Sequence, residues 1–402
     1  MTHSHETERA LSGVRVLDLS RILAGPFCTM MLGDLGAEVV KVERPGTGDD
    51  TRTWGPPFSG GESAYYLCCN RNKRSITIDL GKSQGRELVK ELAKVSDVLV
   101  ENFTPGLMER FGLDYETLRE LNPRLVFCSV TAYGKDGPYR DRPGYDMVLS
   151  AVGGLMWITG ERNGNPCKVG VAITDVLTGV YASGAITAAL LWRERSGRGQ
   201  QIDCSLLDAQ VAALANIASN YLVAGQEATR WGTAHASIVP YQVFPTKDRP
   251  IAVAVANQKL WVSFCSAIGK KEWVEDPRFE SNPERVRNRD VLLPLVTHVL
   301  AQRTCDEWME VLLEAAVPCG PGNNMESLFA DPQVKHRNMI AEVPHPTIGT
   351  LRLTGVPIKY SVTPGQVRLP PPLLGQHTDE ILSSVLGCSQ ERIAALRRDG
   401  VV

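Results

Sequence analysis

The chain has 402 residues, of which 43% are hydrophobic and 22% are charged, and its formal net charge at pH 7 is −2. This length is enough for a large hydrophobic core and usually implies two or three domains. Lys and Arg residues are spread along the chain rather than gathered into a basic stripe, so nucleic acid is not an expected partner.

The cysteine and histidine patterns predict no metal site. Ten cysteines are spread along the chain, and the adjacent pair Cys68 and Cys69 lacks the Cys-x-x-Cys spacing of zinc and redox motifs. The cysteines are typical of free thiols in a reducing compartment. His3 and His5 lie in a polar N-terminal stretch that we expect to be frayed rather than metal-binding.

The same N-terminal stretch is informative about the cellular compartment of the protein. It has no apolar core of the kind that a secretory signal needs, and Glu6 and Glu8 argue against an acid-poor transit peptide. As written, the sequence predicts a cytoplasmic protein. The mitochondrial matrix is the alternative if the chain is the processed form of a eukaryotic protein.

One segment approaches the composition of a membrane span. Residues 176–192 form an uncharged run of 17 residues, which would be about 26 Å long as a helix at 1.5 Å per residue. The run is rich in Gly, Ala, Ser and Thr and stands alone, which favours a buried core helix. We therefore expect no membrane association.

The first 130 residues alternate strand and helix signals. An apolar run at 14–19 precedes a helix that Gly25 and Pro26 open and Gly36 ends, because proline suits the first turn of a helix and glycine suits its left-handed end. Ser83 is a suitable N-cap for a second helix through residue 94. Strands separated by helices predict right-handed crossovers and an α/β domain with a doubly wound parallel sheet. The further strands are expected at 38–42, 75–80, 98–100 and 125–130.

The order of predicted helices and strands is less regular after residue 130. A long helix is expected from near Asp175, followed by a strand at 200–204 and a helix through residue 223. A proline-marked region then holds a strand at 251–255 and a helix at 291–301, and a last helix runs from an N-cap at Thr378 to residue 386. We predict a large domain over 1–224, a smaller domain over 225–331 and a C-terminal return to the large domain over 332–402.

Nucleotide-binding motifs are missing from the turn after the first strand. Residues 20–26 lack the three glycines of a dinucleotide fingerprint, and no Gly-Lys-Ser/Thr phosphate loop occurs in the chain. The turn does offer the free N–H groups of a helix N-terminus beside Arg21, with Arg44 at the end of the next strand. This arrangement suits an extended anionic ligand.

Asp175 is an acid alone in an apolar stretch at the start of the long helix. The helix dipole and free N–H groups can keep such a carboxylate ionised and can hold an oxyanion that forms next to it. An Asp in a first helical turn is also a common cap. Position alone therefore leaves a capping role and a catalytic role open.

Several stretches resemble the class III CoA-transferases, the CaiB/BaiF family. They run from the first strand to the last helix: LDLSRILAGP (17–26), GDLGAEVVKVERPGTGDDTR (33–52), NRNKRS (70–75), ENF (101–103) with Pro105-Gly106, AITDVLTG (172–179), RWGTAHASIVPYQ (230–242) and 372–382. The resemblance implies a large coenzyme A-binding α/β domain built from both chain ends, a smaller inserted domain, and two interlocked subunits.

The same resemblance implies an activity and a set of site residues. CoA would move from succinyl-CoA, or a similar acyl-CoA, to a dicarboxylic acid such as glutarate, with acyl-CoA thioesters as substrates and no tightly bound cofactor. Asp175 matches the nucleophile, which would form an aspartyl anhydride and then an aspartyl-CoA thioester. The residues that match coenzyme A contacts are Ile22, Ala24, Arg44, Asn102 and Arg110, with Lys73 less closely matched. The candidates for substrate contact are Tyr145, Arg230, His235 and Gln258.

One stretch departs from part of the family. Some members carry a run of glycines that covers the aspartate, and the corresponding place here is residues 255–258, Val-Ala-Asn-Gln. Gln258 could still act as a lid contact. Whether the loop shields reaction intermediates from water is an open point.

Two other functions compete with CoA transfer. An α-methylacyl-CoA racemase needs an acid/base pair, and such enzymes have a His-Asp pair where this chain has Tyr145 and Asp146. Tyrosine is a poor base at neutral pH because its ordinary pKa is about 10. A non-catalytic acyl-CoA-binding protein that kept the fold is the second alternative.

Overall fold

A computed structural model describes residues 8–402, so the N-terminal stretch with His3, His5, Glu6 and Glu8 lies outside the described residues. The described chain forms two compact units. The first unit contains residues 8–155, 169–225 and 332–402, and the second contains 156–168 and 226–331. The segment 156–168 groups with the second unit, which the sequence did not anticipate; the predicted domains at 1–224, 225–331 and 332–402 stay a prediction.

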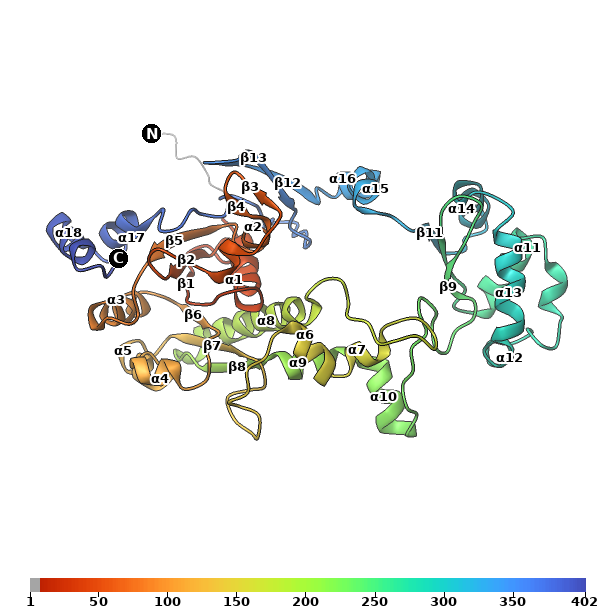
Figure 1. Cartoon of the computed structure of the whole chain (residues 1–402), viewed down its shortest axis with the longest axis horizontal. Helices are drawn as coiled ribbons and strands as arrows, with labels where there is room; N and C mark the ends of the chain where they lie inside the picture. Colours follow the sequence, from red (N-terminus) through yellow and green to blue (C-terminus); the bar gives the residue numbers. More distant parts are fainter. Residues whose placement is uncertain (1–7) are drawn as a thin grey trace. The chain divides into compact units, whose positions relative to one another are not determined.

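The first unit is built on a six-stranded parallel sheet with the order β5-β2-β1-β6-β7-β8 (Figure 1). This order reverses between β1 and β6, as in doubly wound folds that bind ligands at the reversal point. The predicted α/β class with a large parallel sheet is therefore confirmed. The strands are β1 (Arg15–Asp18), β2 (Glu38–Glu43), β5 (Lys73–Thr77), β6 (Val98–Glu101), β7 (Val126–Thr131) and β8 (Gln201–Ser205).

Two hydrophobic cores cover the two faces of this sheet. Because strand side chains alternate, Leu17 of β1 packs with the first core and Val16 with the second. The C-terminal helices α17 (Thr378–Ser384) and α18 (Gln390–Arg398) contribute Ile381 and Leu396 to the first core, together with α3 (Ser83–Lys94). The second core contains α1 (Ala24–Asp34) and α8 (Ile173–Ser196).

The helix α8 is long and apolar enough to cross a membrane, and half of its apolar window is buried inside the fold. Ala182 and Ile186 lie in the core against the sheet. One face of α8 therefore lies in the core, as predicted, while its other face is exposed in the single chain.

Several predicted helix ends differ from the structure. Ser83 and Thr378 are the first residues of α3 and α17, so the N-cap positions are Lys82 and His377. The helix predicted through residue 223 is two helices, because Ala215 has a positive φ of 43° at the junction. The two helices are α9 (Leu206–Ala213) and α10 (Ala215–Ala224).

Short elements complete the first unit. The helices are α2 (Ala64–Leu67), α4 (Leu107–Phe111), α5 (Tyr115–Leu121), α6 (Asp146–Val152), α16 (Pro332–His336) and a 3-10 turn at Asp50–Thr53, and α7 (Leu155–Ile158) spans the junction of the two units. The unit also has two antiparallel pairs of strands. β3 (Phe58–Ser59) pairs with β4 (Glu62–Ser63), and β12 (Ile340–His345) pairs with β13 (Gly349–Thr354).

The second unit has a three-stranded antiparallel sheet with the order β11-β10-β9. Its core combines strand residues such as Val253 with the fully buried Trp261 and with Leu292 and Trp308 from the helices. The elements are β9 (Tyr241–Phe244), β10 (Ile251–Ala254), α11 (Gln258–Ala267), a 3-10 turn at Lys271–Val274, α12 (Asn282–Arg287), α13 (Arg289–Leu300), α14 (Cys305–Glu314), β11 (Cys319–Pro321) and α15 (Met325–Ala330).

Candidate active site

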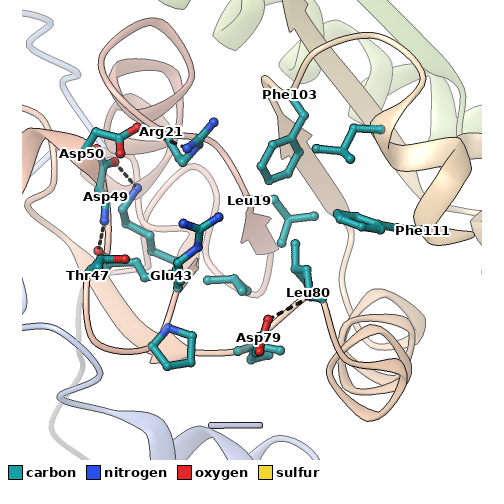
Figure 2. Close-up of a pocket in the computed structure, with 18 residues that line it drawn as sticks. Leu19, Arg21, Glu43, Thr47, Asp49, Asp50, Asp79, Leu80, Phe103 and Phe111 are labelled. Atoms are coloured by element: carbon teal, nitrogen blue, oxygen red, sulfur yellow. Dashed lines mark hydrogen bonds and ion pairs between the residues drawn. The ribbon is translucent and has the colours of Figure 1, made fainter. Parts of the chain in front are cut away.

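A cavity of about 490 Å³ lies at the carboxyl ends of β1, β2, β5 and β6. Figure 2 shows the apolar side chains Leu19, Leu80, Phe103 and Phe111 grouped on one side of it. The guanidinium of Arg21 lies 5.4 Å from the centre of the Phe103 ring. Ligands of doubly wound sheets bind outside the carboxyl ends of the strands, where the strand order reverses. The cavity can therefore hold a ligand with one flat apolar part and one anionic part.

Most charges around this cavity are already paired. Lys41 and Asp49, both fully buried, lie 2.9 Å apart, and the buried Glu43 accepts hydrogen bonds from Arg52. Among the described residues, Arg44 lines the cavity without a carboxylate in ion-pair range. An unpaired arginine in such a place is suited to bind a phosphate.

A second cavity of about 200 Å³ adjoins the first, because Arg21 and Phe103 line both. It lies at the carboxyl ends of β1, β6 and β7 and reaches the start of α8. The lining residues include Ile22, Leu23, Ala24, Asn102, Thr131, Arg140, Arg142, Tyr145 and Asp175. A long ligand can therefore extend from the first cavity to Asp175.

The turn between β1 and α1 joins the two cavities. Ile22 has a φ of 72°, a conformation that a β-branched residue rarely adopts and that is a source of strain. Asp49 accepts the Ile22 N–H at 3.2 Å, and the Asn102 side chain both accepts from the Arg21 N–H and donates to the Arg21 carbonyl. These bonds hold the turn in the strained form.

Asp175 is the third residue of α8 and is 8% exposed. Asp146 fills the capping role instead, because one of its carboxylate oxygens accepts the N–H groups of Thr174 at 2.8 Å and of Asp175 at 3.4 Å. The carboxyl group of Asp175 therefore stays available in the second cavity. Burial, together with the nearby charge of Asp146, raises the pKa of Asp175 from 3.8 to about 7.

A close helix crossing sets the position of Asp175. One turn after Asp175, at Gly179, a Cβ atom would lie 2.7 Å from the carbonyl oxygen of Ala24. Only glycine allows α8 to approach the first turn of α1 this closely. Pro26 has no N–H and the Phe27 N–H donates to the Leu23 carbonyl at 2.7 Å, so Ala24 and Gly25 carry the N–H groups of α1 that have no partner within the helix, and Ala24 lines the cavity that contains Asp175.

The structure brings five of the predicted site residues together around the second cavity: Ile22, Ala24, Asn102, Tyr145 and Asp175. Tyr145 is 61% exposed. Arg44 lines the first cavity, and Arg110 is exposed on α4 between Leu107 and Phe111, which line the same cavity.

Lys73 differs from the other predicted contacts. It is fully buried and lines neither of these cavities, and its ammonium group donates to Asp18, to the Pro26 carbonyl and to Asn70 at 2.9–3.0 Å. All three ammonium protons thus have partners inside the fold. This geometry assigns Lys73 a structural role, and contact with coenzyme A would require it to leave the network.

Three predicted substrate contacts belong to the second unit. Arg230 donates to the carbonyl oxygens of Gly164 at 3.0 Å and Trp157 at 2.9 Å, and His235 accepts the N–H of Ser237 at 3.0 Å. In place of a glycine loop, Asn257 caps α11. The Gln258 oxygen, at the first position of α11, accepts from Arg285 at 3.0 Å, and its amide NH₂ has no hydrogen-bond partner within residues 8–402.

A family model described as CoA-transferase family III matches residues 11–378. The chain belongs to CoA-transferase family III. A human protein named succinyl-CoA:glutarate CoA-transferase is 49% identical over 394 residues, which cover 98% of this chain and 90% of that protein. An Agrobacterium fabrum protein named succinate–glutarate CoA-transferase is 42% identical, over 96% of this chain and 98% of that protein.

A solved structure agrees with this family. The crystal structure of a CaiB/BaiF family protein from Brucella suis is 41% identical, covers 94% of this chain and 99% of that chain, and has a TM-score of 0.84. The resemblance noted in the sequence is thereby confirmed. As a family III member, the chain is a CoA-transferase.

Sequence reasoning missed two arginines of the second cavity, Arg140 and Arg142. They lie in a stretch rich in Gly, Pro and Asp, which reads as an ordinary surface loop. Asp49, which holds the Ile22 turn, was also missed: it lies in the matched stretch 33–52, but a motif match does not show which backbone N–H its carboxylate accepts. Among the described residues no group of three or more His, Cys, Asp or Glu side chains could hold a metal ion.

Proposed function

We propose that this CoA-transferase moves CoA from succinyl-CoA, or a similar acyl-CoA, to a dicarboxylic acid such as glutarate, with Asp175 as the nucleophile. The observation that carries the proposal is the carboxyl group of Asp175, buried and unused by the fold, at the end of two adjoining cavities. The names of the human and Agrobacterium relatives supply the substrate class.

The first cavity suits the nucleotide part of coenzyme A. Phe103 and Phe111 offer apolar surfaces for the adenine ring, and Arg44 and the nearby Arg110 offer guanidinium groups for its phosphates. The pantetheine arm would then pass the Ile22 turn and Asn102, where it can bond to the backbone. This path leads the thioester to Asp175.

The reaction proceeds through two covalent forms of the enzyme. An oxygen of Asp175 attacks the thioester carbonyl of the donor, a C–O bond forms, and the C–S bond breaks to release CoA thiolate. The thiolate attacks the aspartyl carbonyl, which releases the first acid and leaves an aspartyl-CoA thioester. The acceptor carboxylate attacks this thioester, which breaks its C–S bond, releases CoA thiolate and forms a second aspartyl anhydride. The thiolate then attacks the acceptor's carbonyl in this anhydride, which forms the new acyl-CoA and frees the carboxylate of Asp175.

The surroundings of Asp175 serve this chemistry. A buried carboxylate with a raised pKa is a stronger nucleophile once ionised, because it lacks a stabilising hydration shell. The free N–H groups at the start of α1 can stabilise the oxyanion of each tetrahedral intermediate. Since the thioester energy is kept in the covalent intermediates, the exchange needs no ATP and no further cofactor.

A second copy of the chain is the proposed partner. The helix α10 has no buried residue, and its Leu222 and Val223 are 80% and 86% exposed. Leu191 and Trp192 of α8 are also exposed. Apolar surface of this extent usually marks a protein interface, and interlocked subunits would cover it.

The second unit supplies the remaining proposed contacts. Arg230 and His235 are retained as candidate contacts for the acid, and the free amide group of Gln258 as a donor to the acyl group. The expected location, the cytoplasm or alternatively the mitochondrial matrix, is retained as part of the proposal.

The test is to incubate the purified protein with succinyl-CoA and a panel of carboxylic acids without ATP, and to follow new acyl-CoA by mass. Glutaryl-CoA should appear, and Asp175→Ala should make none while keeping its native oligomeric state. Turnover by Asp175→Ala would mean that another residue is the nucleophile. Deuterium entering a 2-methylacyl-CoA from solvent, without transfer, would favour the racemase alternative.

A further inference from the structure

The loop between β7 and α6 carries two arginines into the cavity of Asp175. The backbone of this loop is tied by turns, since the Arg142 N–H donates to the Tyr139 carbonyl at 2.9 Å and the Arg140 N–H to the Gly137 carbonyl at 3.4 Å. Tyr139 packs edge-on against Tyr133 at 5.7 Å between ring centres. These contacts therefore hold the backbone at both arginines in place.

The three arginines that line this cavity differ in how their charge is balanced. Arg21 pairs with Asp50 at 3.1 Å, and Arg140 pairs with the neighbouring Asp141 at 3.4 Å. Within residues 8–402, no carboxylate lies in ion-pair range of Arg142, whose guanidinium lies 3.6 Å from the centre of the Tyr139 ring. Arg142 thus carries an unbalanced positive charge in the cavity that contains Asp175.

We propose that Arg142, assisted by Arg140, binds the far carboxylate of the dicarboxylic acid and so makes the enzyme specific for dicarboxylates. This inference rests on the proposed function. The cavity of about 200 Å³ is small enough to confine a short acid. An extended five-carbon diacid separates its two carboxyl carbons by only roughly 5 Å, given C–C bonds of about 1.5 Å.

The guanidinium group is well matched to this role. Its planar fork can donate two parallel hydrogen bonds to one carboxylate, and the ring of Tyr139 keeps the plane of the fork oriented. A monocarboxylic acid of the same length would place a methyl group there and leave Arg142 unpaired. Arg230, in contrast, already donates to two carbonyl oxygens of the second unit.

The experiment is a competition between two acceptors of equal length, glutarate and pentanoate, with one acyl-CoA donor. With the two acids at equal concentration, the initial ratio of the two products equals the ratio of the kcat/KM values of the acids, so it does not depend on how fast the donor reacts. In Arg142→Gln the ratio of glutaryl-CoA to pentanoyl-CoA should fall about 30-fold, which is about 2 kcal/mol at 1.36 kcal/mol per factor of ten. Arg142→Lys should retain part of the preference.

The control removes another exposed arginine, one whose side-chain exposure matches that of Arg140. Arg124 pairs with Glu194 on the surface, has 48% of its side chain exposed like Arg140, and lines neither of the two cavities. The variant Arg124→Gln should keep the wild-type product ratio. This comparison separates a local contact from a general loss of positive charge.

Two results would overturn the inference. An unchanged ratio with a raised KM for the acyl-CoA donor would mean that Arg142 binds coenzyme A, and an unchanged ratio with no other effect would mean that it binds neither ligand. Failure of the proposed function has a different signature, because the wild-type enzyme would then make neither product.

Discussion

The burial of the Asp175 carboxyl group lowers the stability of the fold at neutral pH. Its pKa is raised from 3.8 to about 7 by burial and by Asp146, so between these values the folded chain keeps a proton that the unfolded chain has lost. The contribution of Asp175 to the free energy of unfolding therefore falls as the pH rises from about 4 to 7 and stays low above 7. At 1.36 kcal/mol per pKa unit, the upper limit of this cost is about 4 kcal/mol.

The variant Asp175→Asn removes this titration and should be more stable than wild type at pH 8, with a much smaller gain at pH 5. The measurement is urea unfolding of both proteins at the two pH values. The exposed Asp136, changed as Asp136→Asn, is the matched control for loss of a carboxylate. An equal gain at both pH values, or a loss at pH 8, would contradict the raised pKa.

At the scale of elements, the crossing of α1 and α8 positions the site. A Cβ at Gly179 would meet the backbone of Ala24, so Gly179→Ala should push the two helices apart. Because Ala24 and Asp175 line the same cavity, we expect a lower melting temperature and a loss in kcat/KM of roughly tenfold or more, about 1.4 kcal/mol. Thermal unfolding and initial rates measure the two effects.

The same helix provides the control for this prediction. A Cβ at Gly184 would meet nothing within 4 Å in the described chain. Alanine is favoured over glycine inside a helix by about 1 kcal/mol, so Gly184→Ala should keep or raise stability. Equal effects of the two substitutions would show that helix propensity, and not the crossing, controls the site.

At the scale of the whole molecule, the apolar surface on α10 predicts the oligomeric state. Replacing Leu222 and Val223 together by Glu places two charges in the proposed interface between copies and should convert a dimer into monomers. Sedimentation velocity measures this change. Val95→Glu alters an exposed apolar residue at the end of α3 and should leave the dimer intact. A wild-type monomer, or a double variant that stays dimeric, would remove α10 from the interface.

The sequence by itself predicted the main elements and pointed to several residues that line the two cavities. Apolar runs separated by helical segments are local signals, so the parallel sheet and α8 could be predicted. Asp175 and Arg44 were named as candidate site residues through family motifs. Cap positions such as Ser83 were missed by one residue, because the exact helix start depends on neighbouring packing.

Only the tertiary structure decided which side chains meet. Asp146 caps α8 from a helix 29 residues before Asp175, Lys73 is held by Asp18 in the buried interior, and Arg142 enters the cavity from a loop with no distinctive pattern. Contacts of this kind join residues that are distant in the chain, and a local pattern carries no information about them. The strained turn at Ile22 likewise exists because Asp49 and Asn102 hold it from the segments that follow β2 and β6, which no propensity of isoleucine would predict.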